Sequence, residues 1–273
     1  MAAEQKTQTN SSATQTAGPA KRRSRRGIRI VLVIVLALVA YAAFDLFAPR
    51  ASRMRSFDAD EVARLETAMW RSYYARQRLQ LYNQLSELLR TQYNLPFIRS
   101  NAVAYQAARA AFVFKDGHSR QDYEKALPYL VNFYSAIRKV SDIPFDVERA
   151  ARLEVEWWII HRERTSHAPS DLPRALAELS SELYQMPAER FAEHARLRAE
   201  AMTIRDTKAD AGGVTEQDWA EIDELLHRSW KSLKDAVNTP GSAAGSAGIL
   251  PAGLNAPGKA RKMPAFPGSG VLI

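Results

Sequence analysis

The chain has 273 residues, a formal net charge of +8 and no cysteine. The lack of cysteine excludes disulfides, thiolate metal sites, cysteine catalysis and a lipid-modified N-terminal cysteine. The positive charge is concentrated at the ends, because residues 1–29 carry +6 whereas residues 57–238 carry −3. A DNA-binding domain would gather its basic residues on one folded face, so we expect no nucleic-acid partner.

Residues 1–29 are predicted to be a disordered basic tail. The first 20 residues consist largely of Gln, Thr, Ser and Ala, which offer little apolar surface to bury. The stretch from Lys21 to Arg29 contains six Lys or Arg and leads directly into an apolar segment.

Residues 30–47 are predicted to be a transmembrane helix. As an α-helix, these 18 residues would extend ~27 Å, which nearly matches a hydrocarbon core of about 30 Å. The excess of basic residues before the segment predicts that the N-terminus lies inside and the following domain outside. We expect Asp45 to reach the lipid headgroups, where its charge costs little, and Tyr41, Phe44 and Phe47 to lie at the same interface.

A cleaved signal peptide is the alternative to a retained anchor. The tripeptide Ala40-Tyr41-Ala42 has the small-x-small form of a cleavage site. The long leader before it and the apolar residues that continue to Phe47 favour retention.

Residues 48–56 are predicted to be a linker, and residues 57–238 an all-α soluble domain of about seven helices. Apolar residues recur at spacings of three and four, and no run shows strand-like alternation without a competing helical pattern. The predicted first helix extends from Asp58 to about Asn94. Signals for later helix starts are Pro96, Ser119 with Asp122, Pro144 with Asp146, Ser170, Pro187, and Thr215 with Asp218.

Two stretches of this domain resemble tetratricopeptide-like helical hairpins. The clearer one comprises residues 104–112, Gly117 and residues 123–130, and the other spans residues 189–237. In the first hairpin, small residues allow close antiparallel packing, and we expect Phe112, Tyr123 and Leu130 to fill the seam. The resemblance implies helical hairpins and a protein-binding role, although no 34-residue period repeats.

Residues 239–273 are predicted to be a disordered tail, because they are rich in Gly, Ala and Pro and have few apolar side chains. The segments 248–253 and 258–265 resemble tails that arise where bacterial genes read into dispersed GC-rich repeats. The resemblance implies a bacterial source, and therefore the cytoplasmic (inner) membrane as the location of the anchor.

The best metal-like pattern is Glu224-x-x-His227, which places a carboxylate and an imidazole on one helical face. Di-iron helical bundles use two such pairs and two further Glu residues. Here one pair exists, with Glu66 and Glu154 as candidate partners, and the competing interpretation is an ordinary surface pair. No residue is therefore predicted to be catalytic, metal-binding or cofactor-binding, and no cofactor is predicted.

Other polar and aromatic residues allow weaker interpretations. Glu154 and His161 share a helical face and could flank a pocket, while Trp157 and Trp158 more naturally pack in a core. The histidines at 118, 167 and 194 are expected to be solvated. Tyr73 and its neighbour at 74 point about 100° apart on a helix, so one of them could face a partner.

Three hypotheses for the function follow. The first is a single-pass, membrane-anchored helical scaffold that binds a protein or peptide outside the cytoplasmic membrane. The second is a metal-binding bundle or enzyme that uses Glu66, Glu154, Glu224 and His227. The third is an envelope structural protein that self-associates as a homo-oligomer.

Overall fold

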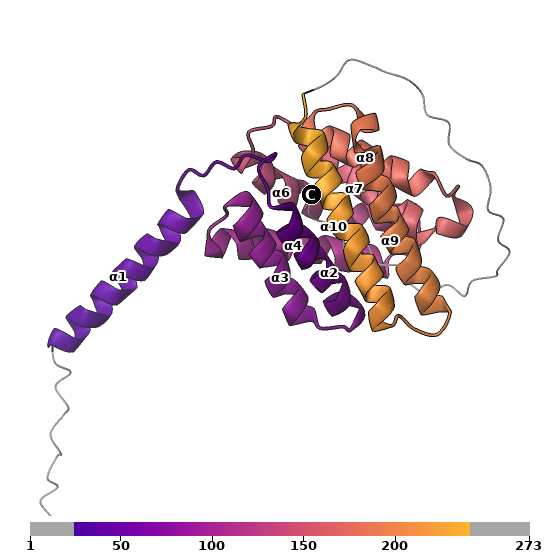
Figure 1. The fold of residues 1–273 in the computed structure, drawn as a ribbon. Coiled ribbons are helices and arrows are strands. Elements are labelled where there is room, and N and C mark those ends of the chain that lie inside the picture. The colour runs from indigo at the N-terminus through magenta and orange to yellow at the C-terminus, as the bar shows by residue number, and fades with distance from the viewer. Residues whose placement is uncertain (1–24, 241–273) are drawn as a thin grey trace, which may run out of the picture. The chain divides into compact units, whose positions relative to one another are not determined.

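A computed structural model describes residues 25–240, and these are helical apart from short connections (Figure 1). Within that range the sole β feature is an isolated bridge between Ser52 and Ser141, so the predicted all-α fold is confirmed for the described residues. The α-helices are α1 Arg25–Phe47, α2 Ala59–Tyr74, α3 Arg78–Tyr93, α4 Phe97–Asp116, α5 Arg120–Tyr123, α6 Leu127–Val140, α7 Val147–Arg162, α8 Asp171–Tyr184, α9 Ala192–Asp210 and α10 Glu216–Asn238; the 3₁₀ helices are η1 Glu124–Ala126, η2 Arg164–Ser166 and η3 Ala188–Phe191. The sequence predicts disorder for residues 1–29 and 239–273, and most of both segments lies outside the described residues. The prediction is wrong for residues 25–29, which form the start of α1.

The chain divides into two units, the first ending at Ala43 and the second beginning at Phe44. The first unit contains most of α1, whose apolar side chains are exposed along its length. The segment from Arg26 to Phe47 is long and apolar enough to cross a membrane, and a window of 18 residues within it has a mean hydropathy of 2.7. A signal sequence near the N-terminus has the same properties.

The helices of the second unit form a closed ring. From α2 to α4 and from α6 to α10, each helix packs against its predecessor, α4 packs against α6, and α10 packs against both α9 and α2 (Figure 1). The ring is therefore closed by the contact between α10 and α2. An open solenoid differs, because each of its repeats contacts only its sequence neighbours.

The predicted helix from Asp58 to Asn94 is in fact two helices, α2 and α3. The chain turns at Arg76, which has a left-handed φ of 60°, and the backbone N–H of Gln77 donates to the carbonyl of Ser72 over 2.8 Å. The turn contains no Gly or Pro, and the helical spacing of apolar residues continues through it. The sequence alone therefore predicts one uninterrupted helix. With this break and the short α5 turn before α6, the described part of the domain has nine α-helices, not seven.

Helix caps predicted from the sequence are present at several positions. The side chains of Asp58 and Asp146 each accept two backbone N–H bonds at the starts of α2 and α7. Ser119 accepts from the backbone N–H of Asp122, and Thr215 forms a complete capping box with Asp218. These signals are local, because a cap and its N–H donors are three residues apart or fewer.

The predicted hairpin from residue 104 to 130 corresponds to α4 packed against α5 and α6. Tyr123 and Leu130 are buried in the seam as expected, whereas Phe112 is 39 % exposed and does not lie in it. The ring of Phe114 takes its place and stacks on Tyr123 with 4.6 Å between ring centroids. A Cβ at Gly117 would lie 2.8 Å from the Tyr123 ring, so the turn requires glycine at this close approach.

The segment 48–56, expected to be a linker, packs against the domain. The backbone of Ser52 donates to the carbonyl of Val140 over 2.7 Å and accepts from the N–H of Asp142 over 3.2 Å. Met54 is buried, and its N–H donates to the Asp142 carboxylate over 3.0 Å. These contacts fix the segment to the end of α6.

The Asp45 side chain is not exposed, as a side chain that extends into the headgroups would be. It is 1 % exposed, and its carboxylate accepts the backbone N–H groups of Ile98 and Arg99 at the start of α4. The expectation fails because the N-terminal N–H groups of a helix need acceptors and attract a negative charge, and those of α4 lie beside this carboxylate.

Candidate binding cleft

A cleft of about 670 Å³ lies between α2, α3, α4 and α9. We call it the aromatic cleft, because large apolar and aromatic side chains form much of its lining. They include Met69, Tyr73, Tyr74, Leu79, Tyr82, Tyr105 and Phe112. The volume falls within the range of about 300–1,000 Å³ that is typical of ligand sites.

Small residues on α4 and the turn between α2 and α3 create this space. Ala107, Ala108 and Ala111 line the cleft from α4, where larger side chains would fill it. The turn at Arg76 ends α2 early and directs α3 back along it, so both helices contribute to one wall. The alanines that suggested close helix packing in the sequence therefore also leave a hollow.

The rim of the aromatic cleft is basic. Six Lys or Arg line it, together with two acidic residues. Arg164 and Arg205 pair with Asp206 or Asp210. The other four have no Asp or Glu within ion-pair distance in residues 25–240, although Arg109 donates to the Tyr129 hydroxyl over 3.3 Å and Arg78 lies over the Phe112 ring at 5.7 Å. We call these four, which have no acidic partner, the free rim cations: Arg76, Arg78, Arg109 and Lys115.

A buried charge network forms the wall of the cleft on α9. Asp206 accepts from Arg205 Nη1 over 2.8 Å, and its second oxygen lies 3.1 Å from His161 Nε2 and 3.5 Å from Arg164 Nη1. Burial opposes ionisation of Asp206, but the close His161 imidazole and the nearby arginines outweigh it and hold the pKa at about 2. The carboxylate is therefore ionised across the physiological range and fixes both arginines.

The phenol rings in the cleft are held in place and stay neutral. The Arg205 guanidinium lies 3.0 Å from the ring centroid of Tyr74, which contacts Tyr73 edge-on at 4.9 Å. Burial raises the pKa of both tyrosines above the usual value. Rings with fixed positions lose little entropy when a ligand packs on them.

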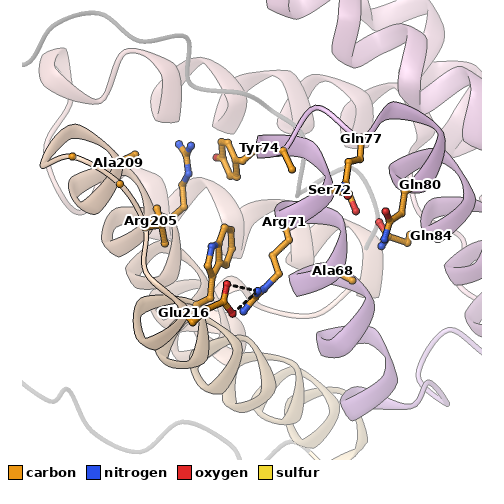
Figure 2. Close-up of a pocket in the computed structure, with 15 residues that line it drawn as sticks. Ala68, Arg71, Ser72, Tyr74, Gln77, Gln80, Gln84, Arg205, Ala209 and Glu216 are labelled. Atoms are coloured by element: carbon orange, nitrogen blue, oxygen red, sulfur yellow. Dashed lines mark hydrogen bonds and ion pairs between the residues drawn. The ribbon is translucent and has the colours of Figure 1, made fainter.

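A second hollow, more polar than the aromatic cleft, shares Tyr74 and Arg205 with it (Figure 2). Arg71 binds the Glu216 carboxylate there over 2.8 and 3.0 Å and lies over the Trp219 ring at 5.1 Å. This ion pair is exposed to solvent, and glutamines from α3 and the turn before it line the opposite side. We take the aromatic cleft as the candidate site because it combines apolar lining with free cations.

The four residues of the metal hypothesis are not assembled into one site. Glu66 binds Arg198 and Trp230, and Glu154 binds Tyr134 and Trp158. Glu224 is exposed on α10, and His227 Nδ1 lies 2.9 Å from the carbonyl of Asp223, one turn earlier in the same helix. In residues 25–240, no group of three or more His, Asp or Glu has the geometry to hold a metal ion.

The histidines differ from their expected environments in two cases. His194, expected to be solvated, is buried, with Nδ1 2.8 Å from Ser229 Oγ. Burial lowers its pKa to about 3. His161 reaches the cleft wall through Asp206, but the other member of its predicted pair, Glu154, binds Tyr134 and Trp158 instead.

Sequence reasoning identified Tyr73 and Tyr74 as a candidate surface and missed the rest of the cleft. Arg205 and Asp206 lie about 130 residues from these tyrosines in the sequence and carry no motif. The one local signal was the run of alanines in α4, which also has the simpler interpretation of close packing.

The chain matches no known protein-family profile, and no curated protein or solved structure shows significant similarity to it.

Proposed function

We propose that this protein is a membrane-anchored helical module that binds an acidic segment of a partner protein. An aromatic or aliphatic side chain of that segment would occupy the aromatic cleft, and flanking carboxylates would meet the free rim cations. The observation that carries the proposal is the combination of an apolar hollow with four cations that have no acidic partner in the described residues.

The charge of the rim favours an acidic partner. Complementary charge at the edge of a site speeds encounter and excludes wrong partners. The tail 239–273 of the chain has three basic and no acidic residues, so like-charge repulsion disfavours it as an occupant. The sequence of residues 104–130, which resembles a tetratricopeptide-like hairpin, also favours a protein-binding role.

The anchor is proposed to be α1, retained in a bacterial cytoplasmic membrane with the N-terminus inside. The supporting features are its hydropathy and the six Lys or Arg between Lys21 and Arg29. The domain would then present the cleft outside the cytoplasm, where a partner at the membrane surface is held at high effective concentration.

Fluorescence anisotropy on the full chain in detergent micelles tests the cleft. The probes are a short labelled peptide with a central Trp flanked by Glu residues, the same peptide with Ala in place of Trp, and the same with Lys in place of Glu. We expect the Glu–Trp peptide to bind and the other two to bind at least about tenfold more weakly, because each lacks one of the two attractions.

Reversing the charge of two rim cations tests whether the peptide binds at the aromatic cleft. Arg76→Glu with Arg78→Glu should weaken the Glu–Trp peptide at least about tenfold, whereas the matched control Lys231→Glu with Lys234→Glu alters two exposed cations on α10 and should leave binding unchanged. Equal weakening by both pairs, or no difference among the three peptides, would refute the proposal. Sedimentation of the unliganded chain as a dimer that Ala108→Phe dissociates would instead identify a second copy as the occupant.

A further inference from the structure

The end of α1 and the start of α4 cap one another. Asp45 accepts the backbone N–H groups of Ile98 and Arg99 over 2.9 and 3.0 Å. In return, the Arg99 guanidinium donates to the carbonyl of Asp45 over 2.6 and 2.9 Å and to that of Ala48 over 2.8 Å. Each side chain satisfies helix-end groups that would otherwise lack partners, so the two helix ends are fixed together.

Exposed aromatic rings surround this junction. Phe47 is 81 % exposed and Phe97, the residue before Ile98, is 57 % exposed. Arg90 lies over the Phe97 ring at 5.7 Å, and Arg50 lies over the Phe44 ring at 5.5 Å. An apolar ring beside a guanidinium suits the boundary between acyl chains and phosphates, where aromatic residues and basic side chains are enriched.

We infer that the start of α4 is a membrane-docking surface, with Phe97 inserted among the headgroups of the bilayer that α1 enters and Arg90 at the phosphates. The inference rests on the proposed retention of α1. The headgroup layer is roughly 5–7 Å thick on each side of the hydrocarbon core. Phe97 is one residue from the N–H group that Asp45 holds at 2.9 Å, so the mutual caps keep Phe97 close to the residues at which the proposed membrane span ends.

This surface is separate from the aromatic cleft along α4. Phe112, which lines the cleft, lies 15 residues after Phe97, or about 22 Å along the helix axis. A partner could therefore occupy the cleft while Phe97 contacts lipid. Docking would hold the domain at one height above the bilayer.

Spin labels on the full chain, reconstituted in phosphatidylcholine–phosphatidylglycerol vesicles, test this surface. The chain has no native cysteine, so Phe97→Cys and the matched control Phe112→Cys each give one labelled site on the same helix. We expect the label at 97 to collide with oxygen more than with a water-soluble nickel chelate, and the label at 112 to show the reverse.

Equal, water-like accessibility at both positions would overturn the docking surface. Because α1 is present in every reconstituted chain, that result would leave the anchor and the cleft standing. Conversely, loss of peptide binding to the cleft would not change the accessibility of the label at 97. A third label at Leu79, which is 82 % exposed on α3, should behave like the label at 112; lipid accessibility there as well would refute a localised surface.

Discussion

Arg198 on α9 and Glu66 on α2 form a fully buried ion pair across the closure of the helical ring. Arg198 donates through Nε and Nη2 to one oxygen of Glu66 over 3.0 and 2.8 Å, and each side chain is 2 % exposed. The second oxygen of Glu66 accepts from Trp230 Nε1 on α10 over 2.6 Å. One carboxylate thus joins the first helix of the ring to its last two.

Removing one member of this pair should destabilise the domain strongly. We expect Glu66→Ala to lower the free energy of unfolding by about 3–5 kcal/mol, because the Arg198 charge would stay buried after losing its hydrogen bonds to the Glu66 carboxylate. Urea denaturation followed by tryptophan fluorescence measures this change. The double variant Glu66→Met with Arg198→Met should recover much of the loss, since both charges of the pair are then replaced by apolar side chains.

The control for that experiment is an exposed pair on the same helix. Arg64 and Glu61 are joined over 2.7 Å, with the Arg64 side chain 54 % exposed, and Arg64→Ala should cost less than about 1 kcal/mol. A loss of similar size at both positions would mean that burial is not what makes the Glu66 pair important.

Glu154 should make the domain less stable as the pH rises. Its burial raises the pKa from 4.5 to about 7, although Tyr134 and Trp158 donate hydrogen bonds to it and Arg198 lies nearby. The folded state therefore holds this proton more tightly than the unfolded state. The resulting stability is complete below about pH 4.5 and is lost as the pH rises through 7, with a total of about 3 kcal/mol.

The measurement compares urea midpoints of the wild type and Glu154→Gln from pH 5 to pH 9. The variant lacks the titrating group, so its midpoint should fall less than that of the wild type across this range. Parallel curves for the two proteins would show that Glu154 keeps an ordinary pKa in the folded state.

His194 should have the opposite pH dependence. Burial, with the nearby Arg198 charge, lowers its pKa to about 3, against the hydrogen bond to Ser229. The folded state thus disfavours the proton, and the stability from this group is complete above pH 6.5 and is lost as the pH falls toward 3. Its imidazole proton resonances should not titrate between pH 8 and pH 5; titration within that range would contradict the buried placement.

The sequence predicts the features of this fold that depend on near neighbours. Caps at Asp58, Asp146 and Thr215 are recognisable because each acts on residues directly after it. The break at Arg76 is not recognisable in the sequence. A left-handed turn without Gly or Pro depends on how α3 packs on α2. The period of the apolar residues alone continues through it.

Local sequence patterns cannot predict which polar side chains of this fold are buried. Asp45 and His194 both lie in contexts that suggest solvent, and each is buried by a partner more than 30 residues away. The aromatic cleft depends in the same way on α9 meeting α2 and α4 across the ring. Nothing within one helix indicates which carboxylate will meet which cation.

The mutual caps of Asp45 and Arg99 should control the depth of Phe97 in the bilayer. In the spin-labelled Phe97→Cys chain, Asp45→Ala removes both acceptors of the first α4 N–H groups. The loss of the cap should cost about 0.5–2 kcal/mol of stability, and the label should become more accessible to the nickel chelate.

The matched control for this last prediction is Asp58→Ala in the same labelled chain. Asp58 also accepts two backbone N–H bonds at a helix start, and its loss should reduce stability by a similar amount. It caps α2 rather than α4, so the label at 97 should keep its lipid accessibility. If Asp58→Ala and Asp45→Ala changed the label equally, general destabilisation would explain the effect; if neither did, the caps would not hold Phe97 at the bilayer.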